Sequence, residues 1–225
     1  MKERVGLYYE EDIIVAWFLS EIISSSTNEK ITFEYTSHTI NYPILGNNSL
    51  EIDPASNSAV KVQEYIIYPD ISTKRVRRIN LISNDVKISE VVFDSNKSRN
   101  DISGNALSKI SVFQGNTLLK YFNVNIENVN NERIFLESIQ EFSGDGLSSK
   151  PPYEFEYINE NLLPGRMEYL ADHWGYYSAN GTEFPYLAQF PWRSAKSKEP
   201  SDYAMYGSLK KIVFPTGGLI RLNMN

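Results

Sequence analysis

The sequence predicts an all-β protein built mainly of antiparallel strands, and three observations support this. Apolar and polar residues alternate with a period of two in many segments, as in Ile31–Tyr35 and Tyr153–Tyr157, which places successive side chains on opposite faces of a strand. Short runs rich in Asn and Gly separate these segments and supply the positive φ angles of tight turns. No window of a dozen residues carries a convincing helical stripe.

The predicted strands are rich in Val, Ile, Tyr and Phe, the residues that strands favour. Glu10–Ile23 fits one helical stretch, but its β-branched run fits a strand equally well. The other predicted strands are Ile31–Tyr35, Val60–Tyr68, Val76–Ile82, Val86–Phe93, Leu107–Phe113, Leu118–Ile126, Ile134–Phe142, Tyr153–Tyr157 and Ile220–Met224. The turn signals are Asn47-Asn48, Ser83-Asn84-Asp85, Gly115-Asn116, Gly144-Asp145-Gly146 and Thr216-Gly217-Gly218.

A degenerate hairpin pattern recurs along the chain. Each copy has Leu-x-x-Ile, then a turn, then an alternating strand. The copies are Leu19-x-x-Ile22 with Ile31–Tyr35, Leu107-x-x-Ile110 with Leu118–Val124, Leu136-x-x-Ile139 with Tyr153–Tyr157, and Leu209-x-x-Ile212 with Ile220–Met224. A lone hairpin cannot bury its apolar face, so the copies are expected to stack on one another. Their spacing is irregular, which favours hairpins along a curled sheet over a strict solenoid.

The composition divides the chain near Leu147. Residues 1–150 are expected to form a hairpin-repeat sheet. Residues 151–225 are expected to continue that sheet, with an aromatic, proline-containing loop over 160–206 and a terminal hairpin. Proline cannot donate to a sheet ladder, which is why 160–206 is predicted to be loop. The two regions together form one continuous structural unit in this interpretation.

The charge balance and residue usage exclude several kinds of function. The chain has 28 acidic and 22 basic residues, two histidines and no cysteine. Disulfide scaffolds, thiolate zinc sites and cysteine nucleophiles are therefore excluded, and the net charge of −6 disfavours nucleic acid as a partner. His38 and His173 have no ligand partner at metal-binding spacing, so no metal or other cofactor is predicted. The apolar run Ile13–Leu19 is too short to span a membrane and lacks the flanks of a signal peptide.

The densest group of chemically versatile residues is Asp172-His173-Trp174-Gly175-Tyr176-Tyr177. An Asp beside a His invites an acid–base role, but adjacent residues in a strand face opposite ways. A hydrolase therefore ranks last, and no catalytic residue is predicted. In the structural interpretation, Asp172 and His173 bond loop backbone while the aromatic rings close the end of the core.

Aromatic side chains in the same region are candidate ligand contacts. Trp174, Tyr176, Tyr177 and Trp192 are suited to a platform for sugar rings, because each offers a rigid apolar face with a polar tip. The basic run Lys74-Arg75-x-Arg77-Arg78 fits a solvated, edge-protecting strand better than a phosphate track.

Several motifs taken together resemble a known family. They are Tyr153-x-Phe155-x-Tyr157, Leu163-Pro164-x-Arg166, the string Asp172 to Tyr177, Gly207-x-Leu209-Lys210-Lys211-Ile212, and Phe214-Pro215-Thr216-Gly217-Gly218. Their order resembles that in Bacteroidetes proteins of the RHS/YD-repeat-associated type, which are long exported or surface-associated chains. The resemblance implies a β-sheet shell of stacked hairpins, of which this chain is an internal segment, and it implies no reaction. Asp172, His173, Gly175, Pro215, Gly217 and Gly218 are structural motif residues in this interpretation.

The expected function is a non-enzymatic structural segment of a bacterial envelope or secreted protein. The resemblance implies neighbouring β-segments of the same or another chain as partners, and a location outside the cell or in its envelope. The alternative is a carbohydrate-binding or adhesive module that uses the aromatic loop, with an envelope glycan as its partner.

Overall fold

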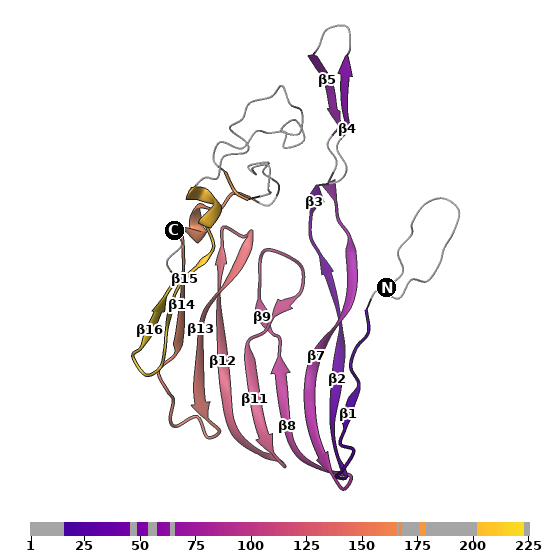
Figure 1. Cartoon of the computed structure of the whole chain (residues 1–225), viewed down its shortest axis with the longest axis vertical. Coiled ribbons are helices and arrows are strands. Elements are labelled where there is room, and N and C mark those ends of the chain that lie inside the picture. The colour runs from indigo at the N-terminus through magenta and orange to yellow at the C-terminus, as the bar shows by residue number, and fades with distance from the viewer. Residues whose placement is uncertain are drawn as a thin grey trace, which may run out of the picture.

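Ten antiparallel strands form one continuous sheet in the computed structural model (Figure 1). The structure describes residues 16–45, 49–53, 58–63, 66–165, 167, 176–178 and 202–222. In order across the sheet the strands are β1 (Glu21–Ile23), β2 (Glu29–Asn41), β7 (Asp70–Ser83), β8 (Val86–Asp94), β11 (Lys109–Gln114), β12 (Thr117–Val129), β13 (Arg133–Ser143), β14 (Tyr153–Tyr157), β15 (Leu209–Val213) and β16 (Leu219–Arg221). The prediction of an all-β, antiparallel fold is confirmed.

Three small hairpins interrupt this order. β3 (Ile44–Leu45) pairs with β6 (Ile66–Ile67), and β4 (Ser49–Asp53) pairs with β5 (Ser58–Gln63), so both lie in the excursion between β2 and β7. β9 (Lys97–Ser98) and β10 (Asn105–Ala106) form the third, between β8 and β11. The strand predicted over Val60–Tyr68 is therefore divided between two hairpins. The described helices are the 3-10 turns η1 (Glu160–Leu162) and η4 (Asp202–Met205).

All four predicted hairpins are present in the pairing of the sheet. Ile22 lies opposite Ile31, Ile110 opposite Phe122, Ile139 opposite Tyr153, and Ile212 opposite Ile220. The Leu-x-x-Ile half and the alternating half of each copy are thus neighbouring strands. Glu10–Ile23, left open between helix and strand, ends in strand β1.

Positive φ angles mark the turns that join the long strands. Asn84 and Asp85 (φ 50° and 60°) connect β7 to β8, and Gly115 (φ 57°) connects β11 to β12. Asn130 and Asn131 (φ 52° and 59°) form the β12–β13 turn, which is not among the predicted turn signals. Asn and Gly tolerate this conformation better than other residues.

The interior of the described chain is thin. Its buried hydrophobic residues are Ala106, Val124 and Val129, and no large side chain among the described residues is completely buried. This is the expected result for a sheet that stands as one layer, because a core forms where two layers meet.

Candidate functional site

One face of the ten-stranded sheet carries a row of apolar side chains that crosses every strand. Residues opposite each other in neighbouring strands share a face, and so do residues two apart in one strand. In order across the sheet the row is Ile22, Ile31, Phe33, Ile79, Val91, Phe93, Ile110, Phe122, Val124, Ile139, Tyr153, Phe155, Ile212 and Ile220. We call this surface the apolar face.

The opposite face is largely polar, and its charges pair with one another. Arg78 lies between two carboxylates, with Nη1 3.7 Å from Glu34 Oε2 and Nε 3.8 Å from Glu90 Oε2. Farther along the sheet, Lys211 Nζ lies 2.6 Å from Glu156 Oε1. These ion pairs join neighbouring strands of the same layer, so the charges of this polar face are paired without a second layer.

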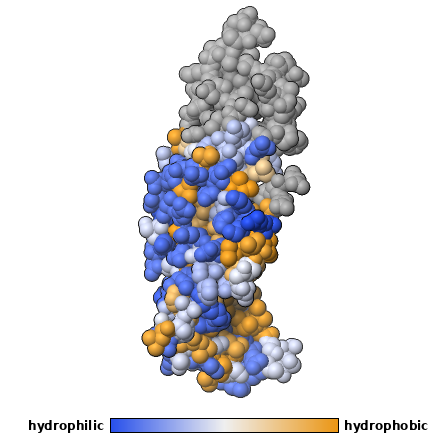
Figure 2. All heavy atoms as spheres, turned by 90° about the vertical axis from the view of Figure 1, so that its left-hand side faces the viewer, coloured by the Kyte–Doolittle hydropathy of each residue, from blue (hydrophilic) through white to orange (hydrophobic). Residues whose placement is uncertain are grey.

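The apolar face, by contrast, is covered only in part by the described chain, where Val124 is its buried member. Ile22, Leu81, Tyr153 and Ile220 are all exposed on it. Seen from the β16 edge, hydrophobic residues gather along one flank of the molecule and at its lower end (Figure 2). A sheet with one apolar face normally buries that face against a second layer, and exposed apolar surface of this kind marks an interaction site.

A cavity of about 310 Å³ lies beside the Pro215–Gly218 turn. The turn is closed by Phe214, whose N–H donates to Gly218 O at 2.8 Å and whose carbonyl accepts from Gly217 N at 2.9 Å. Gly217 has φ +85°, which few other residues adopt without strain. The walls comprise Phe122, Glu141, Lys150, Pro151, Tyr153, Phe214, Pro215 and Thr216. We call this the turn cavity.

The turn cavity combines aromatic surface with one charged cluster. The rings of Tyr153 and Phe214 meet edge to face, with centroids 5.7 Å apart. Glu141 Oε1 accepts from Lys150 Nζ at 3.1 Å, and Lys120 Nζ lies 3.7 Å away. The bond from Lys150 is the main reason that the pKa of Glu141 lies below its ordinary value. Aromatic walls with a few polar groups are typical of small-ligand sites.

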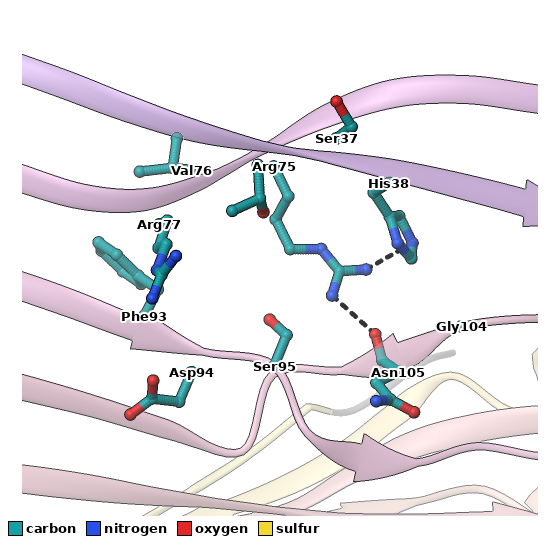
Figure 3. Close-up of a pocket in the computed structure, with 11 residues that line it drawn as sticks. Ser37, His38, Arg75, Val76, Arg77, Phe93, Asp94, Ser95, Gly104 and Asn105 are labelled. Carbon is teal, nitrogen blue, oxygen red and sulfur yellow. Dashed lines mark hydrogen bonds between the residues drawn. The ribbon is translucent and has the colours of Figure 1, made fainter.

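A second cavity, of about 340 Å³, opens where β7 and β8 separate (Figure 3). The last pair between these strands is Arg78 with Val92, and Val76, Arg77, Phe93, Asp94 and Ser95 beyond it line the opening. The walls also include Thr36, Ser37, His38, Arg75, Gly104 and Asn105. We call this the strand-gap cavity.

Arg75 is held in the strand-gap cavity by two neutral acceptors. Its Nη1 donates to Asn105 O at 2.7 Å, and its Nη2 lies 2.7 Å from His38 Nε2. A guanidinium can only donate, so Nε2 accepts and the proton of a neutral His38 ring stands on Nδ1. Burial, and then the charges of Arg75 and Arg99, lower the pKa of His38.

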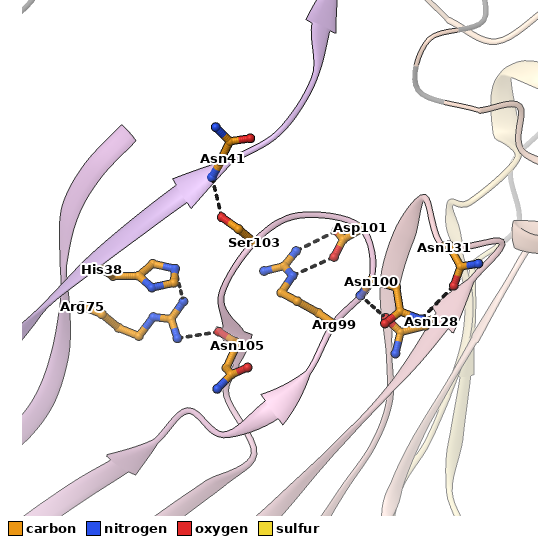
Figure 4. A network of polar contacts seen from close by, with 10 residues as sticks. All are labelled: His38, Asn41, Arg75, Arg99, Asn100, Asp101, Ser103, Asn105, Asn128 and Asn131. Atoms are coloured by element: carbon orange, nitrogen blue, oxygen red, sulfur yellow. Dashed lines mark hydrogen bonds and ion pairs between the residues drawn. The ribbon is translucent and has the colours of Figure 1, made fainter. Parts of the chain in front are cut away.

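A network of polar contacts fixes the β9–β10 hairpin beside this cavity (Figure 4). Asn41 N donates to Ser103 Oγ at 2.6 Å, while Asn41 O accepts from Ser103 N at 3.1 Å. On the other side, Asn100 Nδ2 donates to Asn131 Oδ1 at 2.8 Å. The hairpin thereby bridges β2 and the β12–β13 turn. Gly104 (φ +89°) approaches the His38 ring so closely that a Cβ there would lie 2.5 Å from Cε1.

The predicted ligand-contact residues fall only partly within the described chain. Tyr176 is exposed. The Tyr177 ring packs against Tyr203 and Tyr206 at centroid distances of 5.6 and 5.7 Å. Pro215, Gly217 and Gly218 form the turn described above. Asp172, His173, Trp174, Gly175 and Trp192 lie outside the described residues.

The basic run of β7 does not form one surface. Lys74 Nζ lies 5.7 Å from the Phe18 ring centroid, Arg75 lines the strand-gap cavity, and Arg78 is paired on the polar face. β7 lies between β2 and β8, so it is not an outer strand of the sheet, although its stretch before Arg78 pairs with β2 alone. Most of the basic run therefore lies on a strand side without a described partner, as the edge prediction expects, although the rest of β7 is an inner strand.

The sequence does not predict that Arg75, Ser95, Glu141 and Tyr153 line cavities, although Tyr153 belongs to a strand motif. Arg75 belongs to the basic run of β7, but its contacts with His38 and Asn105 depend on the separation of β7 from β8. The described residues hold no group of three or more His, Cys, Asp or Glu placed to bind a metal ion. None of their helices is long and apolar enough to cross a membrane.

The fold and these surfaces define a single-layer antiparallel sheet protein with one apolar face. Comparison of the chain with protein-family models, with curated proteins and with solved structures finds no significant match.

Proposed function

We propose that this chain is a non-enzymatic structural segment of a bacterial RHS/YD-repeat-like envelope or secreted protein, where it forms part of a β-sheet shell. The observation that supports the proposal is the apolar face, which crosses all ten strands and leaves Ile22, Leu81, Tyr153 and Ile220 exposed. In a shell, neighbouring β-segments of the same or another chain would complete the layer that this face lacks.

The outer strands support the same proposal. β1 and β16 each pair with one described strand, β2 and β15. A strand with one unpaired side offers N–H and C=O groups to another chain. Ile22 on β1 and Ile220 on β16 add exposed apolar surface at both edges, with 49% and 46% of their surface accessible.

Each edge strand offers a matched pair of variants. Ile23 and Leu219 are also exposed, at 65% and 51%, but they lie on the polar face beside Ile22 and Ile220. Ile22→Lys and Ile220→Lys should weaken self-association and binding of a hydrophobic dye, because they place a charge on the apolar face. Ile23→Lys and Leu219→Lys add the same charge to the polar face. They should change self-association and dye binding much less.

Light scattering over a range of protein concentrations measures this association. We expect the wild-type chain to self-associate, and we expect only the apolar-face variants to weaken this association. A strictly monomeric and highly stable wild-type chain contradicts the proposal, and so does an equal effect of all four variants.

A carbohydrate-binding role is the second candidate, and the turn cavity favours it. Tyr153 and Phe214 offer ring faces for a sugar, and Glu141, Lys150 and Thr216 offer polar groups beside them. Tyr153→Ala should then abolish retention on envelope glycan, while Glu154→Ala, on the opposite face of β14, should leave it intact. If instead Trp174→Ala and Trp192→Ala abolish retention, the site is the aromatic loop. No retention by the wild-type chain contradicts both versions.

A further inference from the structure

Arg75 brings a partly buried positive charge into the strand-gap cavity. Two other arginines nearby are matched, since Arg99 is bonded to Asp101 through two nitrogens and Arg78 lies between Glu34 and Glu90, while Arg77 is exposed. Among the described residues, no carboxylate lies within ion-pairing distance of Arg75. A partly buried charge without a counter-charge is unfavourable, so this guanidinium is suited to receive an anion.

The two bonds of Arg75 hold its guanidinium in place without neutralising it. His38 Nε2 and Asn105 O each accept one of its five N–H groups, which leaves three donors. Because the lowered pKa of His38 keeps the ring neutral at pH 7, His38 orients Arg75 and adds no charge of its own.

Ser95 supplies a second donor at the same place. Its hydroxyl is enclosed, has no hydrogen-bond partner in the described part of the chain, and points into the space between Arg75 and Arg77 (Figure 3). A buried hydroxyl without a hydrogen-bond partner is uncommon in folded proteins, because leaving it unpaired is energetically unfavourable. A ligand that accepts a hydrogen bond from it removes this penalty.

The charges that line the cavity select the kind of anion. Arg75 and Arg77 contribute two positive charges and Asp94 one negative charge, so a ligand with a single negative charge balances the cavity. A phosphate monoester carries more charge at pH 7, so it would leave an excess of negative charge beside Asp94. Arginine also matches the planar geometry of a carboxylate through paired N–H donors.

We propose that the strand-gap cavity binds a small organic carboxylate, held by Arg75 and the Ser95 hydroxyl. Its volume of about 340 Å³ is large enough for a ligand the size of a single sugar acid. This site does not depend on the shell function proposed above, because it lies in the gap between two strands and requires no second layer.

Glucuronate is the probe for the experiment, with glucose as the neutral control and inorganic phosphate as the more highly charged one. Each ligand is titrated into the full chain, and binding is measured by calorimetry and by the NMR signal of the His38 ring. The His38→Gln variant lacks this signal and so identifies it. Glucuronate should bind saturably and raise the pKa of His38, because an anion near the ring favours its charged form. Glucose should do neither, and phosphate should bind more weakly.

Arg75→Met should weaken glucuronate binding by at least about tenfold, the usual worth of a charged hydrogen bond. Arg221→Met, on the exposed surface of β16, should bind as the wild type does. Ser95→Ala is a smaller change and should weaken binding several-fold. It tests the same site if Arg75→Met does not fold. The proposal is overturned if wild-type His38 does not respond to glucuronate, if glucose or phosphate binds as tightly, or if folded Arg75→Met or Ser95→Ala retains full affinity.

Discussion

The side-chain nitrogen of Asn80 on β7 lies 2.9 Å from Glu34 Oε1 on β2, on the polar face of the sheet. The same nitrogen also donates to Thr32 Oγ1 at 3.2 Å. Asn80 is only 6% exposed, so its amide depends on these partners rather than on water. Buried polar side chains are thus part of what holds β2 against β7.

Asn80→Ala is therefore expected to lower the free energy of unfolding by about 1–3 kcal/mol, since it removes a buried donor and leaves its two acceptors without it. Urea denaturation measures the change. Thr39→Ala, at an exposed position of β2, serves as the control and should change stability by less than about 0.5 kcal/mol. Equal losses for the two variants would show that Asn80 contributes no more than a surface residue.

The strands that could be predicted from the sequence are those with one polar and one apolar face. Tyr153–Tyr157 alternates strictly and matches β14 at both ends. The alternating pattern does not predict the remaining parts of β2 and β7, which are Thr36–Asn41 and Asp70–Arg75. Those stretches carry polar residues on both faces. They stay in the sheet because they pair with each other.

The two cavities were beyond sequence reasoning for a different reason. Each joins segments that are distant in the chain, as when Arg75 meets Asn105 across the gap between β7 and β8. Which residues face each other there depends on the register of several strand pairs, and the sequence alone does not state it. The Asn130-Asn131 turn, in contrast, carried a readable signal, since paired asparagines favour positive φ.

The stability of the protein should depend on pH through His38. Its pKa is lowered in the folded protein by burial and by Arg75 and Arg99, so the unfolded chain binds a proton more readily. The stability that this group contributes is then fully present above the ordinary histidine pKa of about 6.5 and falls as the pH drops through it. The free energy of unfolding should rise from pH 5 to pH 8.

His38→Gln isolates this effect, because glutamine offers Arg75 an acceptor oxygen and does not titrate. The variant should show a smaller rise in stability over the same pH range, measured by urea denaturation at each pH. Parallel curves for wild type and variant would assign the pH dependence to other groups.

The Arg99–Asp101 pair should anchor the loop between β9 and β10. Both its bonds are 2.7 Å long, and the Asp101 side chain is 2% exposed. Asp101→Asn keeps the shape of the side chain but removes its charge and should cost about 3 kcal/mol of stability, because Arg99 is left without its partner. Asp85→Asn, the same change in the exposed β7–β8 turn, should have little effect on the thermal midpoint. A small loss from Asp101→Asn would mean that solvent replaces the carboxylate.

The turn after β13 should tolerate no side chain at Gly144. A Cβ at this position would lie 1.9 Å from the carbonyl oxygen of Leu118, and Gly144 N donates to Leu119 O at 2.9 Å. Gly144→Ala must therefore move backbone and break a bond between the turn and β12. Gly115→Ala is the matched control: its Cβ would meet open space, so its only cost is the positive φ of 57°, about 1 kcal/mol. In denaturation of both variants, Gly144→Ala should lose clearly more stability than Gly115→Ala, and the reverse order would contradict the close approach of the turn to β12.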